Sequence, residues 1–287
     1  MILVTTAGKV GSAAARLIAQ QDVPVGVLVR HPEKAADLAQ AGVEVFPGDL
    51  DSPESIDKAV RAVSSVILVT SPVLQQELNV IDSAKRAGVE HVVKITNKAD
   101  THSPIARRRI QSEIEDTLVA SGLSHTLLRN NAYMQNFLMM APGIAQTSSF
   151  RTATGDGRIG HVDVRDVAAA AAEIAVSPAD HAGKTYWPTG PESLSGNDVA
   201  EIFTKVLGRP ITFHPISYEV QKQEMIDVGL PKPLPRTTPS RSPGWPTAIV
   251  TTSPTTCHRS SADLPAHSSS SPSTTPRRSR ELQRRRH

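Results

Sequence analysis

Short apolar runs alternate with amphipathic stretches over the first 129 residues of the chain. Six runs have the length and near-continuous apolar character of strands buried on both faces, at residues 2–5, 25–29, 43–46, 66–70, 91–96 and 125–128. Helical periodicity lies between them, over residues 9–20, 32–41, 53–62, 74–87 and 104–121. Six strands with five intervening helices predict an α/β fold with a doubly wound parallel sheet, whose ligands bind at the carboxyl ends of the strands.

The regular alternation ends after residue 129. Irregular segments rich in glycine and proline then join helical stretches near residues 131–141, 163–177, 195–206 and 217–228. We therefore expect residues 1–129 to form a ligand-binding core. Residues 130–232 are expected to form a smaller lobe that closes over the ligand and binds a substrate.

The end of the chain has a different composition. Residues 233–287 contain 20 serines and threonines, nine prolines, nine arginines and no lysine. Such a segment buries too little apolar surface to fold, so we expect a disordered tail. Two origins are open: a native basic tail that binds an acidic partner or a membrane surface, and a shifted reading frame, since GC-rich DNA read out of register gives this bias.

Charge and cysteine content exclude several classes of protein. The net charge of +3 divides into +7 for residues 233–287 and −4 for residues 1–232, and a mildly acidic body argues against a nucleic-acid groove. No apolar run approaches the ~20 residues that cross a bilayer. The single Cys257 excludes an intramolecular disulfide, and neither cysteines nor histidines have metal-ligand spacing. We expect a cytoplasmic protein without metal that acts on a small molecule, with a homodimer as an open candidate.

Two glycines lie between the first predicted strand and the first predicted helix, in "TTAGKVG" at residues 5–11. In dinucleotide-binding proteins one such glycine lets the backbone approach a pyrophosphate, and the next lets the helix pack closely on the sheet. The free N–H groups at the helix N-terminus then bind the anion. The alternative for Gly8 and Gly11 is a plain strand-to-helix turn.

The end of the second predicted strand bears on the choice of dinucleotide. An acidic residue there binds the ribose hydroxyls of NAD, but the segment "VLVRHPEK" places Arg30 and Lys34 where a 2′-phosphate would lie. NADPH is therefore favoured over NADH, and an exposed arginine at a strand end is the alternative. Asp49 is expected either near the adenine or as the N-terminal signal of the next helix.

Small polar residues end the fourth and fifth predicted strands. The segment "VTSP" includes Val69, Thr70 and Ser71, and "ITN" includes Thr96. Their hydroxyl and backbone groups are expected to face the ribose and nicotinamide of the cofactor. The alternative is that they only cap the strands.

The succession of motifs from residue 1 to about residue 233 resembles the NmrA-like atypical short-chain dehydrogenases, in the branch of quinone and triphenylmethane reductases. The motifs are "TTAGKVG", "VLVRHPEKAADLAQAGVEVFPGDLDSPESI", "AKRAGVEHVVKIT", "SGLSHTLLRNNAYMQNFL", "GDGRIGHVDVRDVAAAAA" and "GKTYWPTGPESLS". The resemblance implies a Rossmann-like fold and cofactor contacts by Thr6, Ala7, Gly8, Lys9, Val10, Arg30, Val69 to Ser71, Asn130 to Gln135, and Arg165. The phosphate loop is one residue shorter than the usual TGATGxxG form, and Arg109 stands where many relatives carry histidine.

Two segments bear on the proton chemistry. "YEVQK" at residues 218–222 has the Tyr-x-x-x-Lys spacing of ordinary short-chain dehydrogenases, but it falls in the predicted lobe, and the helix expected over 104–121 has no tyrosine. We interpret that spacing as chance. Asn131 and Tyr133 follow the sixth predicted strand and are candidates to donate hydrogen bonds to a substrate oxygen, while packing of the lobe is the alternative for Tyr133.

Two other runs have simpler interpretations. "RRR" at residues 107–109 predicts a solvated helix face, and "FLMM" at residues 137–140 predicts core packing or, as the alternative, a pocket for a flat substrate. Taken with the resemblance, the chain is expected to be an NADPH-dependent reductase of quinones or similar flat electrophiles. The alternative is a non-catalytic protein that senses NADP(H) and binds a protein partner.

Overall fold

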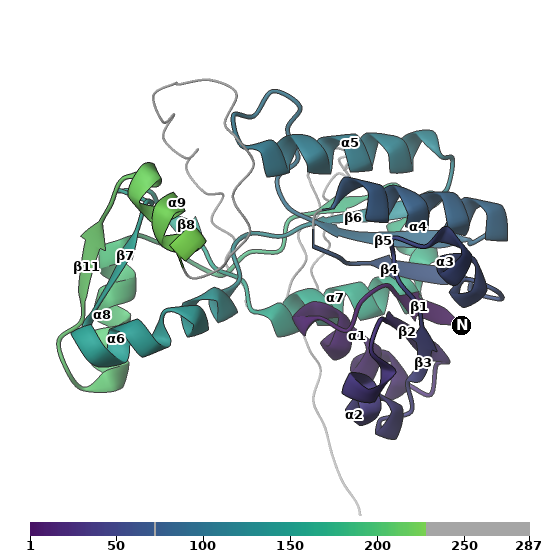
Figure 1. Ribbon diagram of the computed structural model, residues 1–287, viewed down its shortest axis with the longest axis horizontal. Coiled ribbons are helices and arrows are strands. Elements are labelled where there is room, and N and C mark those ends of the chain that lie inside the picture. The colour runs from purple at the N-terminus through teal and green to yellow at the C-terminus, as the bar shows by residue number, and fades with distance from the viewer. Residues whose placement is uncertain (72, 228–287) are drawn as a thin grey trace, which may run out of the picture.

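The computed structural model describes residues 1–71 and 73–227, and it shows a large parallel sheet beside a smaller lobe (Figure 1). Within these residues the large sheet has seven strands in the order β3-β2-β1-β4-β5-β6-β9, and every neighbouring pair is parallel. The strand bounds are Ile2–Val4 (β1), Val25–Val29 (β2), Glu44–Pro47 (β3), Ser65–Leu68 (β4), His91–Thr96 (β5), Ser124–Arg129 (β6) and Thr185–Tyr186 (β9). The predicted doubly wound sheet is confirmed, and its order reverses between β1 and β4, where such folds bind ligands.

Helices cover both faces of this sheet, because successive strand residues point to opposite sides. Ile2 and Val4 pack in one apolar cluster with α1 (Lys9–Ala19), α2 (Ala36–Gln40) and α7 (Val164–Val176). Leu3 packs in a second cluster with α3 (Pro53–Ala59), α4 (Leu74–Ala87) and α5 (Ala106–Ala120). Figure 1 shows the second set of helices above the sheet and the first set below it.

Two elements from beyond residue 129 belong to the large sheet or pack on it, helix α7 and strand β9. The alanine-rich helix α7 packs against α1 and against β4, β5 and β6, since its small side chains allow close approach. Strand β9 adds a short seventh strand beside β6, and its two residues carry too weak a pattern to predict it. The division of the chain at residue 129 stays a prediction.

The smaller lobe contains two short two-stranded sheets. One pairs β7 (Ser149–Thr152) with β11 (Thr212–Pro215), and the other pairs β8 (Ile159–Gly160) with β10 (Ser193–Leu194). Its helical elements are η2 (Met134–Met139), α6 (Ala141–Thr147), α8 (Gly196–Leu207) and α9 (Tyr218–Asp227), while η1 (Pro32–Ala35) precedes α2 and η3 (Pro178–His181) follows α7. The helix predicted over 131–141 is in fact two elements, because Pro142 starts α6 as a new helix.

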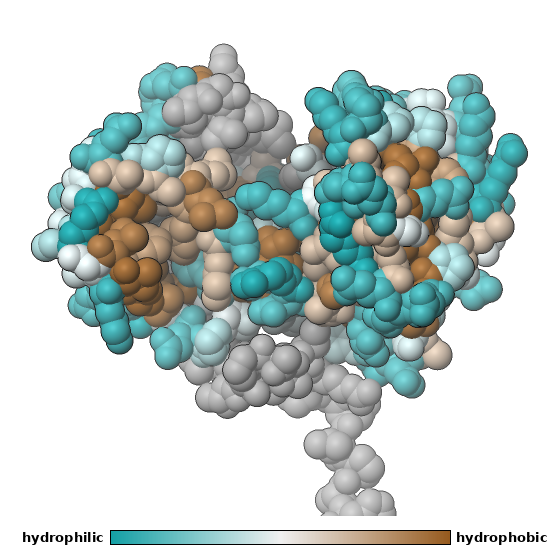
Figure 2. Space-filling view, turned by 90° about the horizontal axis from the view of Figure 1, so that it is seen from below, coloured by the Kyte–Doolittle hydropathy of each residue, from teal (hydrophilic) through white to brown (hydrophobic). Residues whose placement is uncertain are grey.

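The "FLMM" run divides between the interior and the surface of the lobe. Phe137 and Met140 pack against the core of the lobe, as predicted. Leu138 and Met139 are 67% and 62% exposed, so core packing is wrong for these two residues. Because a 3₁₀ helix has about three residues per turn, successive side chains of η2 point to different sides. Figure 2 shows apolar side chains gathered on the surface of the lobe.

The predicted tail, residues 233–287, lies outside the described residues. Its disorder, its native or frameshifted origin and the contacts of a basic tail all stay predictions.

His91, at the start of β5, is 2% exposed and lies between two hydroxyls. Its Nδ1 is 2.9 Å from Ser124 Oγ and its Nε2 is 3.0 Å from Thr126 Oγ1. Thr126 donates its hydrogen to the carbonyl of His181, so His91 Nε2 donates and Nδ1 accepts. Burial, helped by the nearby His125 and His181, lowers the pKa of His91 from 6.5 to about 4.

We expect this histidine to make the fold acid-sensitive. Below pH 6.5 the unfolded chain binds a proton that the folded chain binds only near pH 4, so the free energy of unfolding falls across that window by about 3 kcal/mol. Urea unfolding at pH 7, 5.5 and 4.5 measures the change. His91→Gln should flatten the pH dependence and His102→Gln, at an exposed site, should not. Equal pH dependence in wild type and His91→Gln would contradict the assignment.

Candidate functional site

The loop between β1 and α1 is fixed to the end of β4. Thr5 Oγ1 and Thr6 Oγ1 lie 2.8 Å and 2.9 Å from the carbonyl oxygen of Val69, and the Val69 N–H donates to Thr5 Oγ1 over 2.9 Å. A Cβ on Gly11 would lie 2.0 Å from the backbone oxygen of Thr6. Helix α1 therefore packs directly on the loop backbone, and only glycine fits at position 11.

The N-terminus of α1 is open to a ligand. Gly8 is the N-cap residue, no side chain caps the helix, and no acidic residue lies in the first turn. A Cβ on Gly8 would meet nothing closer than Thr6 Oγ1 at 3.8 Å, so the fold itself leaves room there. Ala7, Gly8 and Lys9 are exposed, whereas the Val10 side chain is buried. The loop thus presents backbone N–H groups to an anion, which fits a pyrophosphate despite its short length.

Two exposed cations follow β2. Arg30 comes directly after the strand and Lys34 lies in η1. Among the described residues, neither side chain has a hydrogen-bond or ion-pair partner. Both are therefore free to bind a phosphate. Asp49 instead forms the turn before α3 by accepting from the Asp51 N–H, and Ser52 is the N-cap residue of that helix.

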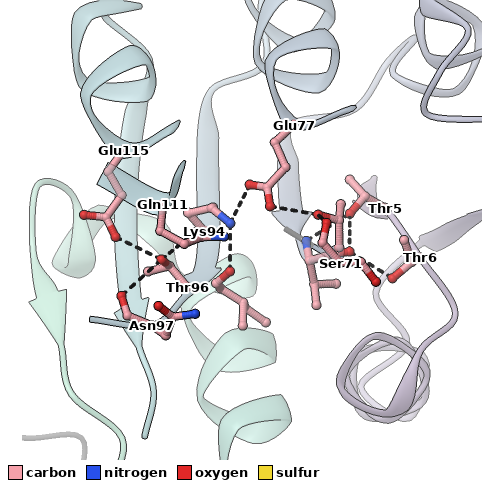
Figure 3. A network of polar contacts seen from close by, with 12 residues as sticks. Thr5, Thr6, Ser71, Glu77, Lys94, Thr96, Asn97, Gln111 and Glu115 are labelled. Carbon is pink, nitrogen blue, oxygen red and sulfur yellow. Dashed lines mark hydrogen bonds and ion pairs between the residues drawn. The ribbon is translucent and has the colours of Figure 1, made fainter. Parts of the chain in front are cut away.

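The polar residues at the ends of β4 and β5 differ in where their hydroxyl groups point. The Thr70 hydroxyl donates to Glu77 Oε1 over 2.8 Å, and Ser71 is exposed. Thr96 is buried, and its hydroxyl lies within hydrogen-bond distance of Gln111 and Glu115 in α5 (Figure 3). The Thr96 hydroxyl therefore faces α5 rather than the open edge of the sheet, so only its backbone can meet the expected cofactor.

The buried Asn130 and the half-buried Tyr133 form a hydrogen-bonded pair after β6. With its amide oriented to satisfy its neighbours, Asn130 donates to the carbonyls of Leu128 and Thr96 over 3.1 Å and 2.8 Å. Its Oδ1 then accepts from the Tyr133 hydroxyl over 2.9 Å. Burial raises the pKa of Tyr133 to about 12, and the charge of Arg107 acts in the opposite direction. Tyr133 therefore stays protonated at neutral pH.

Arg107 is a further candidate for the site, which the sequence interpretation of "RRR" as a solvated face did not name. It is exposed, but it lies in the first turn of α5, and its charge acts on the Tyr133 hydroxyl. Arg109 donates to the Ser103 carbonyl over 2.6 Å and so has a local structural contact. The available signal was its place at the start of the helix that follows β5, because such helices begin near the carboxyl edge of a parallel sheet.

The remaining candidates lie near the junction of the large sheet and the lobe. Asn131 Nδ2 is 3.4 Å from Thr189 Oγ1. Gln135 donates to Asp163 Oδ1 over 2.9 Å and accepts from the Val164 N–H over 3.0 Å, so it holds the start of α7. Arg165 makes two side-chain hydrogen bonds to Asp163 and holds the pKa of that carboxyl far below its usual range. The structure brings Gln135 and Arg165 together, with the Arg165 side chain 83% exposed.

The Tyr-x-x-x-Lys spacing lies on α9 in the smaller lobe, and Lys222 Nζ is 3.7 Å from Glu219. Helix α5, where a relay of this kind follows β5, contains no tyrosine. Within residues 1–71 and 73–227, no cluster of three or more His, Cys, Asp or Glu residues is arranged to hold a metal ion. In the same part of the chain, no helix is both long and apolar enough to cross a membrane.

This geometry agrees with comparisons to known proteins. The chain is 34% identical over 238 residues to the NAD(P)H azoreductase of Xenophilus azovorans, which covers 82% of this chain and 83% of the relative. The structure of the NADPH-dependent quinone oxidoreductase of Escherichia coli in complex with NADPH superposes with a TM-score of 0.73 at 32% identity, covering 81% of this chain and 84% of that one.

The triphenylmethane reductase of Citrobacter sp., in complex with NADP(H), superposes with a TM-score of 0.72 at 28% identity, covering 81% of this chain and 85% of that one. Each of these relatives is a nicotinamide-dependent reductase by name or by bound cofactor. The model of the NmrA-like family matches residues 1–237, which spans the large sheet and the described lobe. The chain therefore belongs to the NmrA-like family.

Proposed function

We propose that the protein is an NADPH-dependent reductase that transfers hydride to a quinone or a similarly flat electrophile. The observation that carries the proposal is the pair of unpartnered cations, Arg30 and Lys34, which follow β2, while the open N-terminus of α1 follows the neighbouring parallel strand β1. That arrangement suits a dinucleotide with an extra phosphate on its adenosine ribose. The similarity to azo, quinone and triphenylmethane reductases supports the class of acceptor.

The chain's own residues would bind and orient the two reactants. The backbone of residues 6–11 binds the pyrophosphate, and Arg30 and Lys34 bind the 2′-phosphate. NADPH, when bound, supplies the hydride. Asn131 and Tyr133 bind the acceptor oxygen that gains negative charge, and the exposed Arg107 adds a positive field. Because the Tyr133 hydroxyl donates to Asn130, it must turn toward the acceptor to stabilise it, and its raised pKa keeps the proton on the phenol.

Steady-state oxidation of NADPH with a panel of small quinones tests the proposal. Turnover that requires both the quinone and NADPH supports a reductase. A second candidate is a protein that senses NADP(H), which is favoured by the lack of a tyrosine on α5. Tight NADPH binding without turnover of any acceptor would favour the sensor.

Tyr133→Phe should lower kcat about tenfold while the dissociation constant for NADPH changes little. The lost hydroxyl removes one hydrogen bond to a developing anion, which contributes about 1.5 kcal/mol or more. Stopped-flow turnover and calorimetric NADPH binding measure the two quantities. Tyr218→Phe, on α9, is the control and should leave kcat unchanged. A larger loss in Tyr218→Phe than in Tyr133→Phe would show that the lobe tyrosine, not Tyr133, serves the reaction.

A further inference from the structure

A buried ion pair lies beneath the carboxyl edge of the large sheet. Lys94 of β5 and Glu77 in the first turn of α4 are both 0% exposed. Lys94 Nζ is 2.5 Å from Glu77 Oε2 and donates to the Ile95 carbonyl over 2.9 Å (Figure 3). Burying two charges costs so much that an apolar pair of similar volume is often equally stable or more stable. Stability alone therefore does not account for this pair.

The ion pair fixes the turn that follows β4. Lys94 contacts one oxygen of the Glu77 carboxylate, and the other oxygen, Oε1, accepts from the Thr70 hydroxyl over 2.8 Å. The same hydroxyl is 2.6 Å from the carbonyl oxygen of Ser71, so its single hydrogen is shared between the carboxylate and the backbone of this turn. The ion pair with Lys94 fixes the rotamer of Glu77, and the fixed carboxylate in turn fixes the position of the Thr70 hydroxyl.

The other side of this turn is held from β1. Val69, the residue before Thr70, is bound by the hydroxyls of Thr5 and Thr6. A continuous chain of polar contacts and one short backbone step thus runs from Lys94 through Glu77 and Thr70 to the loop before α1. Figure 3 shows both parts of this chain side by side, with Glu77 between Lys94 and the threonines. It connects the loop to which the proposed function assigns the pyrophosphate with the turn, residues 69–71, that the sequence predicts to face the ribose and nicotinamide.

We propose that Glu77 and Lys94 are positioning residues, which act through Thr70 to hold residues 69–71 in the conformation that binds the nicotinamide half of NADPH. This inference rests on the proposed function, since it takes NADPH as the ligand. The pair touches neither reactant. Its effect is confined to one end of the cofactor, because Arg30 and Lys34 bind the other end from β2 and η1.

Calorimetry with two ligands separates positioning from general structural support. NADPH carries both halves of the cofactor, whereas 2′,5′-ADP carries only the adenosine half with its 2′-phosphate. Thr70→Val keeps the side-chain volume and removes the hydroxyl. Thr70→Ser keeps the hydroxyl and removes only the methyl group. Glu77→Leu combined with Lys94→Met removes both charges together, which avoids an unpaired buried ion. Asp57→Asn is the control. Asp57 of α3 forms an exposed ion pair, 2.6 Å long, with Arg86, which lies at the opposite end of α4 from Glu77.

We expect Thr70→Val and the double variant to weaken NADPH binding about tenfold and to change 2′,5′-ADP binding by less than about twofold. Thr70→Ser and Asp57→Asn should bind both ligands as wild type does. Equal losses for both ligands, or unchanged NADPH binding in Thr70→Val, would overturn the positioning role. NADPH binding without quinone turnover would overturn the reductase proposal alone, and a wild-type protein that binds neither ligand would overturn both.

Discussion

Gly11→Val should lower the affinity for NADPH by more than about tenfold and reduce the free energy of unfolding by about 1–3 kcal/mol. The first side-chain atom at position 11 would lie 2.0 Å from the backbone oxygen of Thr6 and 3.1 Å from the Val4 side chain. That backbone cannot yield easily, because Thr5 and Thr6 are bound to Val69. The strain must then displace the N-terminus of α1, whose N–H groups are expected to bind the pyrophosphate.

Gly8→Ala gives the matched control for this substitution. Its new Cβ has 3.8 Å to the nearest atom, and Gly8 has φ −72°, which alanine adopts freely. We expect wild-type stability for Gly8→Ala, and any loss of NADPH affinity then reports how closely the pyrophosphate approaches. Thermal unfolding and calorimetric titration measure both effects. A Gly11→Val protein with wild-type stability and affinity would show that this loop does not cradle phosphates.

Much of the fold could be predicted because its strands are continuous apolar runs with helical periodicity between them. All six predicted strands are present, and the helices predicted over 163–177 and 195–206 correspond to α7 and α8. What failed were features set by long-range packing. β9 has two residues and exists because the β6 backbone offers a free edge, and Leu138 and Met139 are exposed by the course of η2.

The candidate site divides in the same way. Glycine positions such as Gly11 could be predicted, because a backbone contact excludes every side chain and leaves a signal in one residue. The direction of a hydroxyl or amide could not, since Thr96 and Gln135 take partners from α5 and α7, which lie elsewhere in the chain. Lys94 did leave a signal: a charged residue inside the apolar run "HVVKIT" must have a buried partner. Nothing local identified that partner as Glu77.

Arg30→Asp should weaken NADPH binding by about 1.5–3 kcal/mol, roughly tenfold to 150-fold, and should change NADH binding little. The guanidinium follows β2 without a partner among the described residues, so the substitution removes only its contact with the ligand. The new carboxylate repels a 2′-phosphate, whereas it can accept hydrogen bonds from the free ribose hydroxyls of NADH. Dissociation constants for both cofactors, measured by calorimetry, give the selectivity.

A change in net charge alone would also weaken binding of an anion, so the control must carry the same change elsewhere. Arg61→Asp does so, because Arg61 is exposed between α3 and β4, where the chain enters the amino end of the strand rather than the carboxyl edge. We expect Arg61→Asp to keep wild-type affinity for both cofactors at 0.15 M salt, where charges more than about 8 Å apart are largely screened. Equal losses for NADPH and NADH in Arg30→Asp would remove the 2′-phosphate assignment, and with it the main support for NADPH as the cofactor.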